Sequence, residues 1–330
     1  MPESCCESAE RPPGSGESPA GPSLDTDHAL GTLAADGFAY FRDHAHADTG
    51  LVADSTRPGS PASIAVVGFA LAAYPAAAHR GWMSRDDALQ HTLATLRFFE
   101  DAPQDESPDA AGHRGFFYHF LDMETGRRAG GCELSTIDTT LLLAGGLAAA
   151  AFFDGPDRDE ADVRRIAEKL YRAADWNWAR DGGLTVTHGW TPEGGFLPHR
   201  WRGYDEALIL YLMGLGSPTH PLPRESYRAW TSTYDWREAY GTEYLYAGPL
   251  FTHQYSHVWI DFRGIRDAFM RAKGIDYFEN SRRATLVHRE YSIRNPRGFD
   301  GYCHCCWGLT ASDGPGPAER TIDGRCRLFY

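Results

Sequence analysis

The chain has 330 residues, of which 42% are apolar and 13% aromatic, so it can bury a large core. Its formal net charge of −13 argues against nucleic acid and against an anionic membrane surface as partners, because both need clustered basic side chains. No apolar run approaches the roughly 18 residues that a membrane-spanning helix requires. The composition therefore favours a globular protein with a neutral ligand, and it leaves the oligomeric state open.

The first 23 residues are rich in Pro, Gly, Ser and Glu and lack the basic and apolar segments of a secretory signal. We expect a disordered tail there, followed by one domain over residues 24–330. The seven cysteines are odd in number and clustered, which is not typical of a secreted disulfide framework. These features predict a cytoplasmic location, while a periplasmic or secreted enzyme stays open as an alternative.

Helical periodicity divides most of the chain into helices. Amphipathic patterns predict helices over 27–45, 84–100 and 158–174, the last two on the outside of the fold. Nearly continuous apolar patterns predict buried inner helices over 60–78 and 136–153. Four more helices are predicted over 204–215, 225–232, 260–272 and 276–291.

The alternation of inner and outer helices predicts an all-α fold in which two concentric rings form an (α/α)6 toroid. A linear helical array would also alternate, but it would show a fixed repeat length, which this sequence lacks. Aromatic and glycine-rich connections at 112–133, 181–203 and 241–257 contain enough β-forming residues for short hairpins. Long connections of this kind usually build binding sites.

Acidic residues that stand beside these aromatic connections are the candidates for acid/base chemistry. Glu206 is the strongest, because it is expected to enter the first turn of an inner helix directly after Trp201 and Tyr204. The alternative is that Asp205 and Glu206 only complement the helix dipole, as acids in a first turn commonly do.

A second acidic candidate lies at the start of the inner helix at 136–153. Ser135 and Asp138 have the spacing of an N-terminal capping box, so Asp138 could serve only to satisfy backbone N–H groups. Glu133 precedes the helix and is not explained by capping. Both carboxylates therefore stay as catalytic candidates.

Two further clusters combine polar and aromatic side chains. The segment 253–263 offers the ring faces and planar polar groups that sugars need, whereas a zinc site at His253 and His257 lacks the intervening acid of the metalloprotease motif. Cys303, His304, Cys305 and Cys306 are contiguous, which suits tetrahedral metal coordination poorly, so incidental packing is the first interpretation. We expect no metal and no cofactor.

Several segments resemble the glycoamylase-like family, with the most specific match at residues 203–211, GYDEALILY, and 216–221, GSPTHP. Together the matching segments cover about residues 27 to 317. The others are STIDT at 135–139, GFFYHFLD at 115–122, FTHQYSH at 251–257, WIDFRG at 259–264 and WGLTASDGP at 307–315. The family is similar to bacterial (α/α)6 toroids that include endo-β-1,2-glucanases and the glycoamylase-like module of cyclic β-1,2-glucan synthases.

The resemblance implies a glycoside hydrolase that cleaves a β-glucan, most readily β-1,2-glucan, by two-carboxylate catalysis with inversion. It implies Glu206 as the acid and sugar contacts in the segment 253–263, and we expect Asp138 or Glu133 to position the water. The candidate substrate-binding residues are Asp54, His119, Asp122, Trp190, Arg202, Tyr204, Asp205, His253, Gln254, His257, Trp259, Asp261, Arg263, Trp307 and Asp313.

Two departures from the family pattern leave alternatives open. Family domains continue well past the segment 307–315, whereas this chain ends at Tyr330, so a toroid with an incomplete C-terminal end is one expectation. Such a chain would be a glycan-binding or transglycosylating module without hydrolytic turnover. The run of Cys and His at 303–306 motivates a second alternative, a zinc-dependent toroid enzyme.

Overall fold

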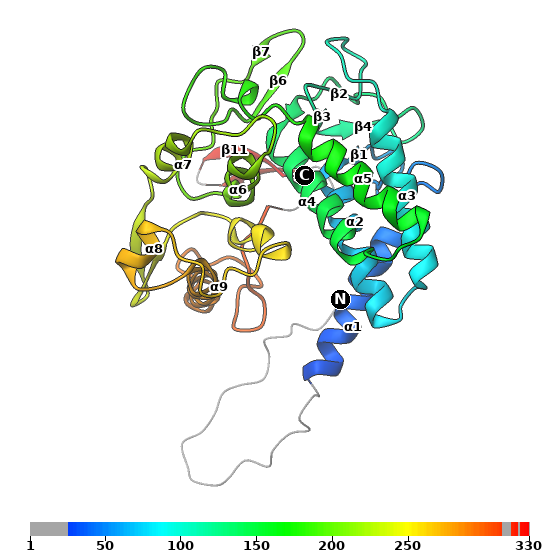
Figure 1. The fold of residues 1–330 in the computed structure, drawn as a ribbon. Helices are drawn as coiled ribbons and strands as arrows, with labels where there is room; N and C mark the ends of the chain where they lie inside the picture. The colour runs from blue at the N-terminus through cyan, green and yellow to red at the C-terminus, as the bar shows by residue number, and fades with distance from the viewer. Residues whose placement is uncertain (1–25, 312–317, 323, 330) are drawn as a thin grey trace. The chain divides into compact units, whose positions relative to one another are not determined.

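The computed structural model of the chain describes residues 26–311, 318–322 and 324–329 (Figure 1). The fold is mostly helical with several short antiparallel sheets. It divides into two compact units, each described by itself: the first comprises the chain up to Gly203 together with Ala207–Thr233, and the second comprises Tyr204–Glu206 together with the chain from Tyr234 onward. The predicted tail and Asp313 lie outside the described residues, and the assignment of 24–330 to one domain stays a prediction.

Most predicted helices of the first unit are confirmed to within two residues. They are α1 at Thr26–Asp43, α3 at Arg85–Asp101, α4 at Thr136–Phe152, α5 at Arg158–Ala173 and α7 at Arg224–Thr231. Capping side chains fix three of these starts, since Ser84, Ser135 and Asp157 each accept a hydrogen bond from the backbone N–H three residues on. None of the described helices is both long enough and apolar enough to cross a membrane.

Two inner helices begin four residues later than the sequence pattern predicts. Helix α2 runs over Ile64–Arg80, because Ala62 and Ser63 form a short strand, β1, that pairs with β4 at Phe120–Leu121. Helix α6 runs over Leu208–Gly216, and the residues before it form turns. Apolar periodicity alone cannot distinguish a buried strand or turn from the first turn of a buried helix.

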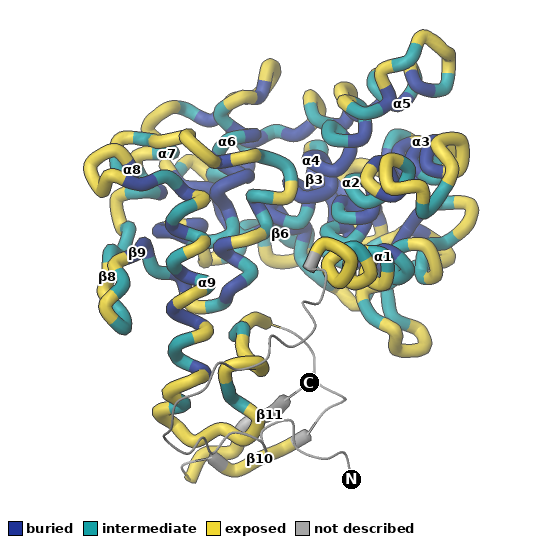
Figure 2. Tube along the Cα trace, turned by 90° about the horizontal axis from the view of Figure 1, so that it is seen from below, coloured by how far each residue is buried: buried dark blue, intermediate teal, exposed yellow. Residues whose placement is uncertain are grey.

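The core of the first unit is built around α2 and α4, whose backbones approach closely. A Cβ atom on Gly145 would lie 2.1 Å from the carbonyl oxygen of Gly68, and one on Gly68 would lie 2.3 Å from that of Leu141. Only glycine permits this approach. Helix α4 also contacts α5 and α6, and it is buried along most of its length, whereas α1 is largely exposed (Figure 2).

Short strands lie at the end of the bundle where α2 and α4 begin (Figure 1). Five of them form an antiparallel sheet in the order β2-β3-β5-β6-β7. Their bounds are Gly112–His113 for β2, Phe116–Tyr118 for β3, Leu134–Ser135 for β5, Gly189–Thr191 for β6 and Gly195–Phe196 for β7. A 3-10 turn, η1 at Trp178–Arg180, precedes β6. The central strand β5 runs directly into α4, so the sheet fixes the position of the residues at the start of that helix.

In the second unit the longest helix is α9, Tyr277–Arg294, which begins as predicted with Asp276 as its N-cap. It packs against a hairpin, and the Asn280 amide makes both backbone hydrogen bonds of Leu245. The other elements are β8 at Trp236–Ala239, β9 at Thr242–Leu245, η2 at Leu250–His253, η3 at Tyr255–Val258, α8 at Ala268–Lys273, β10 at Ala318–Ile322 and β11 at Arg325–Phe329.

Two predictions in this unit are wrong in extent. The helix predicted at 260–272 is only the short α8, because Gly264 adopts a φ of +78° and Asp267 caps a new helix start. The hairpin predicted within 241–257 begins earlier, at Trp236, with Tyr240 and Gly241 at its turn, and the rest of that stretch forms 3-10 turns.

Candidate active site

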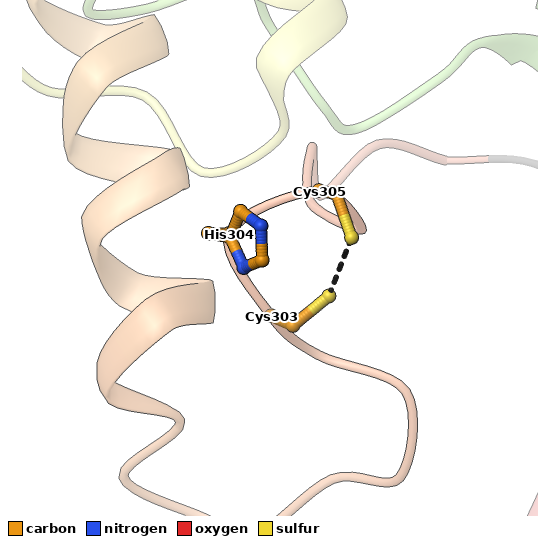
Figure 3. A group of neighbouring side chains, drawn as sticks. All are labelled: Cys303, His304 and Cys305. Carbon is orange, nitrogen blue, oxygen red and sulfur yellow. Dashed lines mark hydrogen bonds between the residues drawn. The ribbon is translucent and has the colours of Figure 1, made fainter. Parts of the chain in front are cut away.

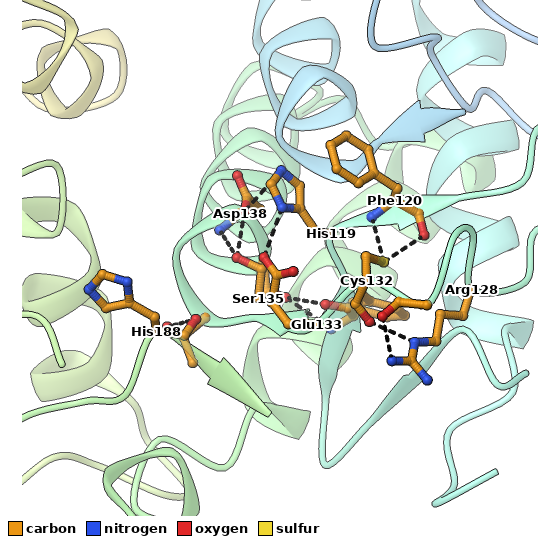
Figure 4. A network of polar contacts seen from close by, with 12 residues as sticks. His119, Phe120, Arg128, Cys132, Glu133, Ser135, Asp138 and His188 are labelled. Carbon is orange, nitrogen blue, oxygen red and sulfur yellow. Dashed lines mark hydrogen bonds and ion pairs between the residues drawn. The ribbon is translucent and has the colours of Figure 1, made fainter. Parts of the chain in front are cut away.

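The candidate site in the first unit is centred on His119, which lies between β3 and β4. Its carbonyl accepts a hydrogen bond from the backbone N–H of Ile64 at the start of α2, and its own N–H donates to the carbonyl of Glu133 just before β5. These backbone bonds bring together segments about 55 and 14 residues apart in the sequence. The side chains of His119, Glu133 and Asp138 consequently face one another at the start of α4 (Figure 4).

The imidazole of His119 connects two carboxylates. Its Nδ1 lies 2.9 Å from Glu133 Oε1, and its Nε2 lies 3.6 Å from Asp138 Oδ2. The ring stacks on Phe120 with centroids 4.0 Å apart. The side chains of His119 and Glu133 are about 30% exposed and that of Asp138 is 14% exposed, so a ligand in solution can reach the cluster.

The three groups differ in how their pKa values shift. Burial raises the pKa of Asp138 and outweighs the nearby His119, which lowers it. Burial also acts to raise the pKa of Glu133, but the hydrogen bond from His119 and backbone bonding outweigh it, and the net direction is down. Burial acts to lower the pKa of His119, yet the bond to Glu133 and the charges of Asp138 and Asp54 raise it overall. The environment therefore separates two neighbouring carboxylates into one stronger and one weaker base.

Ser135 forms the N-cap that the sequence predicts. Its hydroxyl accepts from the Asp138 backbone N–H at 3.2 Å and donates a short hydrogen bond to Asp138 Oδ2. The N-cap at Ser135 is therefore confirmed, and the carboxylate of Asp138 bonds the capping hydroxyl through Oδ2, while its catalytic role stays a prediction.

Arg128, which holds the loop that carries Glu133, was not among the residues selected from the sequence. Its side chain is 3% exposed, and it donates to the carbonyls of Cys132 at 2.6 Å and Gly131 at 2.8 Å. It also pairs with Glu193 and stacks over Tyr118, and Figure 4 shows its guanidinium beside Cys132. No local sequence pattern predicts these contacts, because they join residues up to 65 positions apart.

Aromatic side chains lie beside this cluster. Trp201 is buried, stacks on His188 with centroids 3.8 Å apart, and donates its Nε1–H to Thr136 Oγ1 at 3.1 Å. Trp190 on β6 stacks on His113, 5.1 Å away. His188 was not selected from the sequence, although its pKa is lowered by burial and raised in part by the charge of Glu133, which indicates that it lies near the carboxylates.

Asp54 and Asp122 occupy the loops at the same end of this unit. Asp54 is exposed and its charge acts on both His119 and Tyr40. Asp122 is exposed and caps a turn through hydrogen bonds from Thr125. An open hollow of about 690 Å³ lies here, lined by Asp122 and by both neighbours of Asp54 along the chain.

The segment around Glu206 is divided between the two units. Arg202 is an exposed residue of the first unit, whereas Tyr204, Asp205 and Glu206 belong to the second. Glu206 lies in a turn two residues before α6 and not within its first helical turn, as the sequence suggested. Asp205 and Glu206 are both half-buried. Tyr204 is buried against Tyr234, His253 and Tyr277, and its burial raises the pKa of its hydroxyl.

The two histidines of the segment 253–263 are buried or half-buried, and burial lowers the pKa of each. His253 is fully buried, and burial lowers its pKa to about 4. Its Nε2 lies 3.5 Å from the carbonyl of Ala247, and its Nδ1 has no partner in the described part of the chain. His257 lies 2.9 Å from the Ser281 hydroxyl, and burial lowers its pKa as well.

The remaining predicted residues of the second unit are closer to the surface. Asp261 and Arg263 are exposed and form a two-point ion pair with each other, with both contacts at 2.7 Å. Gln254 is exposed, Trp259 is half-buried, and Trp307 is 39% exposed. A sugar could stack on such a ring, while the ion pair would have to open to bind hydroxyl groups.

Comparison with known proteins places these features in a family. The Glycoamylase family model, described as "Putative glucoamylase", matches residues 198–326. A solved "putative glucoamylase" from Bacteroides uniformis is similar to this chain with 30% identity and a TM-score of 0.80, over 88% of this chain and 72% of that one. An endo-β-1,2-glucanase from Chitinophaga pinensis, solved with sophorotriose and glucose, is similar with 27% identity and a TM-score of 0.78, over 89% and 73% of the two chains.

A curated relative, an exo β-1,2-glucooligosaccharide sophorohydrolase from Parabacteroides distasonis, is 26% identical over 314 residues. That match covers 84% of this chain but 41% of the relative, so the chain spans less than half of its length. The identity and mutual coverage with the Bacteroides structure decide the assignment: the chain belongs to the glycoamylase family.

Proposed function

We propose that this chain hydrolyses β-1,2-glucan or its oligosaccharides by two-carboxylate acid/base catalysis. The observation that carries the choice of base is the raised pKa of Asp138, whose carboxylate lies 3.6 Å from His119 and close to Glu133, which has a lowered pKa. Two similar proteins named for β-1,2-glucan hydrolysis support the choice of substrate. The mechanism proposed below uses no metal ion and no cofactor.

Glu206 is the proposed general acid and protonates the glycosidic oxygen as the bond to the sugar carbon breaks. Asp138 is the proposed base, because of the two carboxylates it has the raised pKa and so binds a proton more readily. Its carboxylate would take the proton from the attacking water. Glu133 is a positioning residue that orients His119 through the 2.9 Å contact.

We also propose that the helices belong to an (α/α)6 toroid. The support in the first unit is the alternation of apolar α2, α4 and α6 with amphipathic α3, α5 and α7. The TM-scores of 0.78 to 0.80 with family structures are consistent with it. In such a fold the loops at one end of the inner ring surround the site, and the cluster around His119 lies at the N-terminal end of two inner helices.

Product analysis with linear β-1,2-glucan tests the catalytic roles. Wild type is expected to release oligosaccharides, whereas Glu206→Gln and Asp138→Asn should each lower kcat by roughly 10²- to 10⁴-fold. Matched controls are Glu168→Gln on α5 and Asp36→Asn on α1, which make the same chemical changes at exposed positions. Proton NMR of the first product should show the α-anomer, since inversion converts a β-linkage into an α-product.

A different experimental outcome would support each alternative to this proposal. If the wild-type chain binds β-1,2-glucooligosaccharides in calorimetry and releases none, it is a glycan-binding module and the enzyme proposal is wrong. If wild type is active and Asp138→Asn is equally active, Asp138 is only a helix cap. A β-anomeric first product would exclude the inverting mechanism.

A further inference from the structure

The turn that follows α9 brings three soft metal ligands together. Cys303 Sγ, a ring nitrogen of His304 and Cys305 Sγ all lie within 4.8 Å of one another (Figure 3). The two sulfur atoms are 3.1 Å apart and hydrogen-bonded, a distance far longer than the roughly 2.05 Å of a disulfide, so they do not form a disulfide with each other. The backbone N–H of Cys303 donates to the carbonyl of Cys306 at 3.2 Å, which closes the turn around the three side chains.

The distances within this turn are compatible with one tetrahedral metal ion, although the three ligands are contiguous in the sequence. Two sulfurs bound to one tetrahedral zinc ion at about 2.3 Å are about 3.8 Å apart, so Cys303 and Cys305 need to separate by less than 1 Å. Their side chains and that of His304 are at least partly exposed, which leaves room for that adjustment. A divalent cation between the two sulfur atoms would bind them as thiolates and replace their direct contact.

The cysteines of the chain are concentrated at this turn. Three of the seven cysteines of the chain lie within four residues of this turn. By contrast, Cys132 is half-buried in the first unit and bonds the backbone of Phe120, and the exposed Cys326 lies on β11. Thiolate with imidazole is the ligand set that selects zinc and other thiophilic ions.

We propose that Cys303, His304 and Cys305 bind one thiophilic divalent metal ion of the zinc class, with water in the remaining position. The site lies outside the cluster of carboxylates proposed for catalysis, and it does not depend on the proposed function. Because all three ligands come from one turn, the ion would stiffen that turn and would not join distant segments.

Cobalt titration tests the site directly. The full chain is reduced, stripped of metal with a chelator and titrated with Co²⁺ without oxygen. We expect one equivalent to bind with thiolate-to-cobalt charge-transfer absorption, and Zn²⁺ to displace it. Cys303→Ser and Cys305→Ser should each weaken binding by at least about a hundredfold, more than the loss of an outer-shell contact does.

The matched control is Cys326→Ser, the same change at another exposed cysteine of the second unit. It should bind Co²⁺ as wild type does. The proposal is overturned if reduced wild type shows no charge-transfer absorption, or if both serine variants in the turn bind as tightly as wild type. Loss of the absorption in Cys326→Ser alone would also overturn it. Circular dichroism of each variant confirms that it is folded.

Discussion

Replacing either of two adjacent glycines in α4 should have opposite effects on stability. Gly145 faces α2, and an added Cβ would lie 2.1 Å from the carbonyl oxygen of Gly68. Gly146 faces the other side of α4, where an added Cβ would lie 3.4 Å from Leu96 Cδ2 and 3.8 Å from Ala167 Cβ, ordinary packing distances. The two substitutions, Gly145→Ala and Gly146→Ala, are therefore chemically identical but differ in what the new methyl group meets.

The expected magnitudes follow from those distances. The methyl group of Gly145→Ala comes about 0.9 Å closer to backbone than the 3.0 Å limit that real Cβ atoms respect, and neither helix backbone can move as a side chain could. We assign it the upper end of the overpacking range, about 3 kcal/mol, offset by about 1 kcal/mol of gained helix propensity. Net destabilisation is then about 2 kcal/mol, while Gly146→Ala should gain about 0.5–1 kcal/mol.

Urea unfolding followed by circular dichroism measures both variants against wild type. The free energies of unfolding should differ by about 2.5–3 kcal/mol between the two variants, with wild type in between. If Gly145→Ala is as stable as Gly146→Ala, the backbones of α2 and α4 do not approach as closely as described. Because Asp138 lies in the first turn of α4, Gly145→Ala should also lower the rate of glucan release.

Two other predictions concern the polar groups around the candidate site. Thr136→Val should destabilise the fold by about 1–3 kcal/mol relative to Thr136→Ser, because it leaves the buried Trp201 Nε1–H and the Thr187 carbonyl unpaired; equal urea midpoints would refute this. The pKa of His119 is raised in the folded chain, since the Glu133 bond and nearby carboxylates outweigh its burial. Its contribution to stability should be complete below the unfolded value of about pH 6.5 and disappear as pH rises through the folded pKa. The stability difference between wild type and His119→Gln should shrink over that interval, and a pH-independent difference would contradict the charged network.

The helices were largely predictable because their signals are local. Ser84 and Asp157 cap α3 and α5 where polar residues stand directly before amphipathic runs, and these starts match the prediction within one or two residues. The errors arose where an apolar or polar run continues across a change of structure. Ala62 and Ser63 look like the first turn of an inner helix, but their backbone groups pair with β4, a partner nearly 60 residues away.

The candidate site was only partly predictable for the same reason. Glu133 and Asp138 could be selected from the sequence, since both lie beside a predicted helix start. The placement of His119 between them depends on backbone pairing among β3, β4 and β5, which a single sequence does not specify. Arg128 holds the loop of Glu133 through the carbonyls of Gly131 and Cys132, and the charge of Glu133 acts on His188, so their places near the site appear only in the folded chain.

The proposed catalytic role of Asp138 is compatible with its place beside the N-cap of α4. An acid in the first turn of a helix is ordinarily held ionised by the helix dipole, and a hydroxyl bond such as that from Ser135 adds to this effect. In this chain the pKa of Asp138 is nevertheless raised, because burial outweighs the charge of His119 and the hydrogen bond from Ser135. The bond from the Ser135 hydroxyl holds Oδ2, while burial raises the affinity of the carboxylate for a proton, which suits the proposed role as a base.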